Sequence, residues 1–234
     1  YLLSHTVMPV EVPDQAGVDR FLPPYKPHTI LDPADPRNLN QVTLADPRMN
    51  AEGALCHGYL ELRYLLQEAL ERAPETIETA GEEYERIFGR NWGGMTWSYR
   101  AEDADVLLVA AGSLASEATV AVDALREEGI AAGVLGIRVY RPFPRKAVVE
   151  GCRRAKLAVV FDKSLSYGYE GPIAADLKAA LFGNPSTPAV QSCVCGLGGR
   201  DVKAPELAGA ARDTLQDLAA GLVGRQLRWI NCRI

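Results

Sequence analysis

The stretch Val106-Leu107-Leu108-Val109-Ala110-Ala111-Gly112-Ser113 decides the fold class. Its apolar residues run without interruption from 106 to 111, which is typical of a strand buried on both faces of a parallel sheet. Gly112 and Ser113 then mark a turn, and Ser113 is placed to cap the amino end of a helix over 114–128. Gly129 follows where a terminating glycine belongs. The segment therefore predicts a strand that leads directly into a covering helix.

The same alternation continues downstream. Apolar, β-branched runs predict three more strands, at 134–140, 157–161 and 190–195. Helices are predicted between and after them, at 145–155, 172–182 and 205–220. This order predicts an α/β fold, an open and mostly parallel sheet with helices on both faces. The loops beyond the carboxyl ends of the strands should gather on one edge, at 111–113, 141–144, 162–171 and 196–201.

The front of the chain is rich in proline. Eight of the 15 prolines fall between Pro9 and Pro47, which prevents a continuous helix, although a short one over 14–21 with Asp14 as its cap is possible. Apolar residues such as Phe21 and Tyr25 favour an arm that lies along another surface over a solvated linker. The chain begins with Tyr1 rather than methionine, from which we expect a preceding domain.

A helical segment separates this arm from the sheet. Leucine and tyrosine side chains recur at helical spacing from Leu55 to Leu70, Pro74 should break the run into two pieces, and Gly89 should end it. Four regions are thus predicted: residues 1–50 with the arm, a helical connector at 51–98, the α/β domain at 99–222, and a basic tail at 223–234. The tail is expected to be solvated.

Composition excludes several classes of protein. With 47% hydrophobic residues, 24% charged residues and a net charge of −5, the chain is globular, and its charge does not suggest a nucleic-acid partner. No apolar run is long enough for a membrane span. The cysteines are five and scattered, and the first residues lack the pattern of a signal peptide, so we expect a cytoplasmic protein.

Two strand–helix loops are candidates for binding an anion. Ser113 stands at a predicted helix start, where backbone amides can hold a phosphate, and Gly198 and Gly199 lead into Arg200 and Asp201 in a turn that can do the same. The alternatives are a plain helix cap at Ser113, and a tight turn in which Asp201 caps a helix and pairs with Arg200.

A second loop offers exposed aromatic side chains. Tyr167, Gly168, Tyr169 and Glu170 suit a subunit interface or the wall of a ligand site. Asp162, at a strand end, is either a catalytic carboxylate or a cap for the following helix.

Other residues do not complete a catalytic or metal site. Cys193 and Cys195 should share one face of their strand as buried apolar residues, since a metal would need further ligands. The residue sets for hydrolysis, hydride transfer and metal catalysis are all incomplete, so no catalytic, cofactor-binding or metal-binding residue is assigned.

Several motifs, taken in order, resemble a known family. The chain is similar to the C-terminal part of the alpha subunit of pyruvate:ferredoxin oxidoreductase. The motifs that carry this resemblance are Gly136-Ile137-Arg138-Val139-Tyr140-Arg141-Pro142-Phe143-Pro144, Asp162-Lys163-Ser164-Leu165-Ser166-Tyr167-Gly168-Tyr169-Glu170-Gly171 and Gly196-Leu197-Gly198-Gly199-Arg200-Asp201-Val202, with Ser4-His5-Thr6, Pro9-Val10-Glu11-Val12-Pro13-Asp14 and Phe21-Leu22-Pro23-Pro24-Tyr25 at the front.

The resemblance implies a role within a complex. The complete enzyme oxidatively decarboxylates pyruvate or a related 2-oxoacid with coenzyme A, giving acyl-CoA, carbon dioxide and reduced ferredoxin, and it uses thiamine diphosphate and iron–sulfur clusters. Residues 99–222 would resemble the C-terminal domain of transketolase, and residues 1–50 would contain the end of a thiamine-binding-type first domain. The partners implied are the beta, gamma and delta subunits and ferredoxin.

This chain lacks the positions that the family uses for catalysis. The acidic residue that activates thiamine and the residues that grip the 2-oxoacid belong to the first domain. The resemblance therefore implies a scaffold and interface role, with no cofactor bound wholly by this chain and no activity of the chain alone. The cysteines before Gly196 depart from the aliphatic residues usual in the family, a difference expected to alter core packing rather than chemistry.

Two alternatives remain open from the sequence. One is a non-enzymatic module that binds an anion or a nucleotide at Ser113 and Arg200. The other is an enzyme of origin that acts on a different 2-oxoacid, such as a branched-chain one or oxalate.

Overall fold

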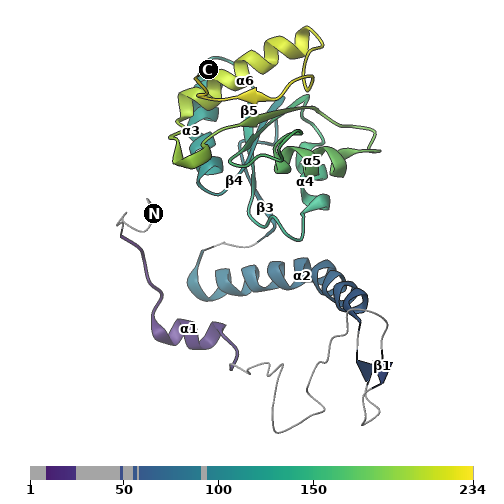
Figure 1. Ribbon diagram of the computed structural model, residues 1–234. Helices are drawn as coiled ribbons and strands as arrows, with labels where there is room; N and C mark the ends of the chain where they lie inside the picture. Colours follow the sequence, from purple (N-terminus) through teal and green to yellow (C-terminus); the bar gives the residue numbers. More distant parts are fainter. Residues whose placement is uncertain (1–8, 25–47, 50–54, 57, 91–93, 234) are drawn as a thin grey trace. The chain divides into compact units, whose positions relative to one another are not determined.

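The computed structural model describes residues 9–24, 48–49, 55–56, 58–90 and 94–233 (Figure 1). The chain divides into two compact units. One lies within residues 8–93, and the other runs from Gly94 to the carboxyl end. Each unit is described by itself below.

The larger unit is built on a six-stranded sheet with the order β3-β5-β4-β6-β7-β8. Only β3 runs antiparallel to its neighbour within this sheet; the other pairings are parallel. The predicted α/β class and mostly parallel sheet are therefore confirmed. The strands are β3 (Thr96–Tyr99), β4 (Val106–Ala111), β5 (Ala132–Ile137), β6 (Leu157–Asp162), β7 (Ala189–Val194) and β8 (Arg228–Trp229).

Helices cover both faces of this sheet (Figure 1). The side chains of β4 alternate between two core clusters, since Leu108 packs with α3 (Ser113–Glu127) and α6 (Ala204–Ala219). Leu107 packs instead with α4 (Arg145–Cys152) and α5 (Pro172–Leu181). Two buried faces explain why the strand sequences are apolar throughout rather than alternating.

The start of α3 differs from its prediction. Gly112, not Ser113, is the N-cap residue, and no side chain caps this helix end. Gly112 has φ +59°, a conformation that glycine adopts without steric cost, so the chain turns at Gly112 and the helix begins one residue early at Ser113. The predicted cap by the Ser113 hydroxyl is therefore wrong.

The predicted solvated tail is ordered rather than frayed: most residues from 224 to 233 are exposed, but part of the segment pairs with the sheet. Arg228 and Trp229 form β8 and pair in parallel with Cys193 and Val194 of β7. Arg228 additionally forms an ion pair with Asp217 of α6. The C-terminal segment is therefore bound by the edge of β7 and by an acidic residue of α6. Its own sequence has no strand periodicity.

The smaller unit contains α1 (Gln15–Phe21) and α2 (Tyr59–Phe88). The predicted cap of α1 is confirmed, because the Asp14 carboxylate accepts a hydrogen bond of 2.6 Å from the Gly17 amide. The ring of Phe21 packs edge-on against Tyr84 and Phe88 of α2, with ring centroids 5.3 and 6.0 Å away. A Cβ on Gly17 would lie 2.6 Å from the Phe88 ring, so glycine allows this close approach.

Pro74 does not divide α2, contrary to the prediction. The helix runs through it and ends at Gly89, whose φ of +69° confirms the predicted stop. Proline removes one backbone hydrogen bond, but α2 has several helical turns on each side of Pro74, and these keep the helix continuous. The helix begins at Tyr59 rather than near 52, because β2 (Leu55–Cys56) pairs antiparallel with β1 (Arg48–Met49).

The predicted extended course of residues 25–47 lies outside the described residues. Within the part of the chain that is described, no helix is both long enough and apolar enough to cross a membrane.

Candidate functional site

The strand order places a crevice at the carboxyl edge of the sheet. Strand β4 lies between β5 and β6, so the chain leaves it for β5 on one side and later continues through β6 and β7 on the other. The loops after β4 and β6 therefore diverge at this point, which is where open α/β sheets bind ligands.

A cavity of about 280 Å³ occupies this position. It is lined by Ser113 after β4, Lys163 after β6, and Gly199, Arg200 and Asp201 after β7. The sequence analysis had singled out all of these except Lys163. The structure thus brings the two candidate anion-binding turns together at one cavity.

The charges around this cavity are mixed. Glu117 lines it as well, and its Oε1 accepts a hydrogen bond of 2.8 Å from the Ala204 amide at the start of α6. Asp201 lies 3.7 Å from the Lys203 ammonium, and the guanidinium of Arg200 donates to the carbonyl of Asn231. The alternative in which Asp201 pairs with Arg200 is therefore not what the structure shows. Two carboxylates offset the two cations.

The exposed aromatic loop forms a separate site. Gly168 has φ +79°, and the Ser166 amide donates to the Glu170 carbonyl at 3.0 Å, closing a tight turn. Tyr167 and Tyr169 project from this turn with 92% and 68% of their surface exposed. The predicted site residues therefore form two groups at this edge of the sheet: one around the crevice cavity and one at the turn that carries the two tyrosines.

Glu170 connects the turn at 166–170, called here the aromatic turn, to α5. This side chain is buried, and its carboxylate lies 2.6 Å from the Lys178 ammonium on α5. Tyr169, Glu170 and Lys178 line a small cavity together with Ser192. A partly buried ion pair thus fixes the base of the turn, while both tyrosines remain exposed.

Asp162 is a helix cap in this structure. Its fully buried carboxylate accepts hydrogen bonds from the amides of Ile173 and Ala174, at 3.0 and 3.1 Å, at the start of α5. Burial raises the pKa of Asp162 to about 6, although these amides oppose the rise. Of the two readings of Asp162, the hydrogen bonds support the structural one.

Cys193 and Cys195 lie in one core cluster, as predicted from their spacing. Burial raises the pKa of the Cys193 thiol to about 12 and that of Cys195 to about 11. Neither thiol is therefore a ready nucleophile. Among the described residues, no three histidine, cysteine or acidic side chains gather as metal ligands.

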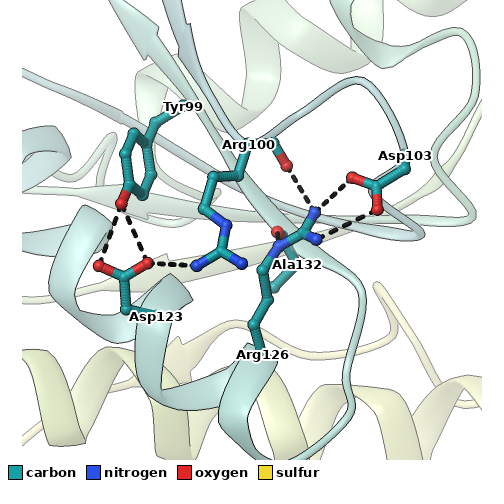
Figure 2. A network of polar contacts seen from close by, with 6 residues as sticks. All are labelled: Tyr99, Arg100, Asp103, Asp123, Arg126 and Ala132. Carbon is teal, nitrogen blue, oxygen red and sulfur yellow. Dashed lines mark hydrogen bonds and ion pairs between the residues drawn. The ribbon is translucent and has the colours of Figure 1, made fainter.

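The opposite edge of the sheet carries a polar network (Figure 2). Arg126, near the end of α3, donates to both carboxylate oxygens of Asp103 and to the carbonyls of Arg100 and Ala132. The network ties α3 to the starts of β4 and β5. It lies at the amino ends of the strands, so we assign it to stability rather than to binding.

Comparison with known protein families shows what this chain is related to. Residues 104–207 match the family model described as pyruvate:ferredoxin oxidoreductase core domain II. This stretch belongs to that family. The core domain II stretch contains β4 to β7 with α3, α4 and α5, and thus both loops that surround the crevice.

Relatives resemble the chain well beyond core domain II. Pyruvate synthase subunit PorA of Pyrococcus furiosus is 39% identical over 234 residues, all of this chain and 56% of that protein. Ketoisovalerate oxidoreductase subunit VorA of Pyrococcus horikoshii is 32% identical, again over the whole chain and 57% of its own length. The chain is thus a PorA-like segment, and it spans slightly more than half the length of these relatives.

A solved structure named "Split gene transketolase, inactive beta4 tetramer" aligns with a TM-score of 0.42 and 22% identity. The alignment covers 51% of this chain and 41% of that one.

Three residues at the carboxyl edge escaped the sequence analysis. Lys163 directly follows a strand end, a position that could have identified it. Glu117 faces the cavity from the first turns of α3, and Trp229 approaches the edge only because β8 pairs with β7. The pairing of β8 had no signal in the local sequence.

Proposed function

We propose that this chain forms part of the alpha subunit of a 2-oxoacid:ferredoxin oxidoreductase that works in the cytoplasm. In the complete complex, pyruvate or a related 2-oxoacid would be oxidatively decarboxylated with coenzyme A to acyl-CoA, carbon dioxide and reduced ferredoxin. The observation that carries this proposal is the 39% identity to a pyruvate synthase subunit over the whole chain. The core domain II match supports the same assignment.

Within that complex, the chain would act as a scaffold and interface. Two of its titratable residues at the carboxyl edge have structural roles: Asp162 caps a helix and Glu170 pairs with Lys178. Thiamine diphosphate, the iron–sulfur clusters and most of the coenzyme A site would then belong to other domains or to the beta, gamma and delta subunits. The α/β domain at 99–222 would hold those parts in register.

The aromatic turn is the proposed contact with a neighbouring subunit or domain. Exposed tyrosines contribute large contact areas at interfaces and lose little side-chain entropy on binding. Tyr167 and Tyr169 stand on a turn whose base is fixed by Glu170, so the contact surface is preorganised. The Gly198–Asp201 turn would extend this contact edge.

Activity of the isolated chain tests the scaffold role. The purified 234-residue chain should show no pyruvate-dependent reduction of ferredoxin, and activity should need the remaining domains and subunits. Turnover by the chain alone would refute the scaffold role while leaving the family relationship intact.

The interface is tested by a double substitution in the assembled complex. Tyr167→Ala with Tyr169→Ala should weaken subunit association about tenfold or more, measured by the concentration dependence of the complex in sedimentation. Phe182→Ala is a matched control, because Phe182 is 85% exposed but lies at the end of α5. If both changes weakened subunit association equally, the proposed contact through the aromatic turn would be contradicted.

The preferred 2-oxoacid is tested by comparing substrates. Because PorA and VorA relatives are both similar over the whole chain, pyruvate and 2-ketoisovalerate are the substrates to compare. The higher identity to PorA favours pyruvate.

A second candidate function is a non-enzymatic module that binds an anion or a nucleotide. The cavity shared by Ser113, Lys163 and Arg200 is the observation that favours it. Calorimetric titration with phosphate tests this site, and its mixed charge predicts weak binding.

A further inference from the structure

Arg200 also lines a second cavity. This cavity occupies about 240 Å³ between the turn that follows β7 and the C-terminal segment 229–233. Its lining includes Leu197 and Arg200 from the turn and Trp229, Asn231 and Arg233 from the tail. We call this cavity the tail cleft. None of the motifs in the family resemblance extends to the tail side of it.

Both walls of the tail cleft are held in place. The Ile230 amide donates to the Val194 carbonyl at 2.9 Å, and Arg200 donates to the carbonyl of Asn231 across the cleft. Farther back, the buried Gln191 accepts from the Gly224 amide at 3.0 Å and donates to the Gln226 carbonyl at 2.8 Å. The cleft is therefore a built feature of the tail packing rather than a gap beside a loose end.

The charge of the tail cleft separates it from the crevice cavity. Its described lining contains Arg200 and Arg233 and no carboxylate, whereas Glu117 and Asp201 line the crevice cavity. Glu206 contacts the tail through the Asn231 side-chain amide and also accepts from the Lys203 backbone amide, but it does not line the cleft. An anion in the tail cleft would therefore meet two guanidinium groups and no lining carboxylate.

The side chains of the tail cleft favour a particular class of ligand. Guanidinium groups recognise phosphate oxygens with paired hydrogen bonds, and Arg200 has further N–H donors beyond the one given to Asn231. Trp229 is about half exposed and offers an indole face on which a planar base can stack. At about 240 Å³ the cavity is smaller than the roughly 300–1,000 Å³ of a typical drug-sized site, so it would hold only part of a ligand's surface.

We propose that the tail cleft binds a nucleoside monophosphate, with the phosphate between Arg200 and Arg233 and the base against Trp229. This site goes beyond the proposed scaffold role and does not depend on it. It also differs from the predicted site at Ser113, since the two cavities share Arg200 and no other described lining residue.

Calorimetric titration of the whole chain with AMP, inorganic phosphate and adenosine tests the proposal. AMP should bind saturably and more tightly than either phosphate or adenosine, because it alone supplies both groups. Arg233→Gln and Trp229→Leu should each weaken AMP binding about tenfold or more. Arg153→Gln, an equal loss of charge on an exposed residue after α4, should leave AMP binding unchanged.

Lys163→Gln distinguishes the two cavities, because Lys163 lines the crevice cavity and not the tail cleft. It should leave AMP binding unchanged. A loss with Lys163→Gln but not with Arg233→Gln would move the ligand to the crevice and overturn the proposal. Phosphate binding as tightly as AMP, adenosine binding as tightly as AMP, or no saturable binding would also overturn it.

A measurement on the unaltered protein guards against misfolded variants. Cys232 lines the tail cleft and is exposed, whereas Cys152, Cys193 and Cys195 are buried. Saturating AMP should slow the alkylation of Cys232 by N-ethylmaleimide at least several-fold. Mass spectrometry of the peptide that contains Cys232 measures the rate. An unchanged rate of alkylation at saturating AMP would contradict binding in this cleft.

Discussion

Asp162 and Gly171 are packed so closely that a Cβ on Gly171 would lie 2.1 Å from the Asp162 Oδ2 atom. The absence of a side chain at Gly171 lets the end of β6 approach the start of α5, where the Asp162 carboxylate receives two backbone amides. This relationship fixes both ends of the loop that carries the exposed tyrosines. It explains why a glycine precedes Pro172 although its backbone, at φ −63°, needs no glycine.

Gly171→Ala should destabilise the protein. The added methyl group would displace the Asp162 carboxylate from the helix start, and overpacking of this kind costs about 1–3 kcal/mol. The free energy of unfolding in urea measures the effect. Gly209→Ala in α6 is the control, since its Cβ would meet nothing closer than 4.0 Å and alanine is the better helix former. Equal destabilisation by both changes would contradict the steric explanation.

The buried carboxyl of Asp162 should make stability depend on pH. Its folded-state pKa of about 6 lies above the ordinary 3.8, so its favourable contribution is complete below pH 4 and is lost as the pH rises through 6. The stability of the wild type relative to Asp162→Asn should therefore fall between pH 4 and 7, by on the order of 3 kcal/mol. A constant difference over this range would refute the assignment.

Asp103→Asn gives the opposite sign in the same experiment. Its hydrogen bond to Arg126 lowers the pKa of Asp103, so the contribution of this carboxylate is present above its usual pKa and is lost as the pH falls. The stability of the wild type relative to Asp103→Asn should thus rise with pH.

Arg126→Gln should cost more stability than Asp103→Asn. The guanidinium is largely buried and donates to the carbonyls of Ala132 and Arg100 at 2.6 and 2.7 Å, in addition to its exposed partner Asp103 (Figure 2). Leaving the carbonyl of the buried Ala132 unpaired would cost about 1–3 kcal/mol, whereas an exposed ion pair contributes little. Denaturant titration of both variants measures the order, and a reversed order would show that the ion pair dominates.

Gln191→Leu should loosen the C-terminal segment. The change leaves the Gly224 amide and the Gln226 carbonyl without their buried partner, at a cost of about 1–3 kcal/mol. Hydrogen exchange of the Ile230 amide, which bonds to Val194, should become at least tenfold faster. Gln216→Leu on the exposed face of α6 should leave this exchange rate unchanged. Unaltered exchange in Gln191→Leu would show that β8 holds the tail alone.

Strongly patterned segments allowed most of the sheet to be predicted from the sequence. The unbroken apolar run of β4 and the helix-compatible segment after it follow from local chemistry, because burial on both faces requires apolar residues throughout. Glycine and proline positions were similarly informative, as the helix stop at Gly89 and the helix start at Pro172 illustrate.

The edge strand β8 and the geometry of the cavities could not be predicted from local sequence patterns. The pairing of Trp229 with Val194 joins segments 35 residues apart and involves only two residues of β8, too few for periodicity to appear. The predicted anion turns did converge, but Glu117 of α3 adds a carboxylate to the cavity that they share.

The sequence by itself determined that this chain is an α/β protein whose strand–helix loops gather at one edge of the sheet, because strand, turn and helix signals depend on residues close together in the chain. Tertiary structure alone decided which charged groups face each cavity. Arg200 can serve either of two cavities, and only the packing of the tail on β7 gives one of them a wall free of carboxylates. Electrostatic character depends on distances in space, and these are set by contacts between segments remote in sequence.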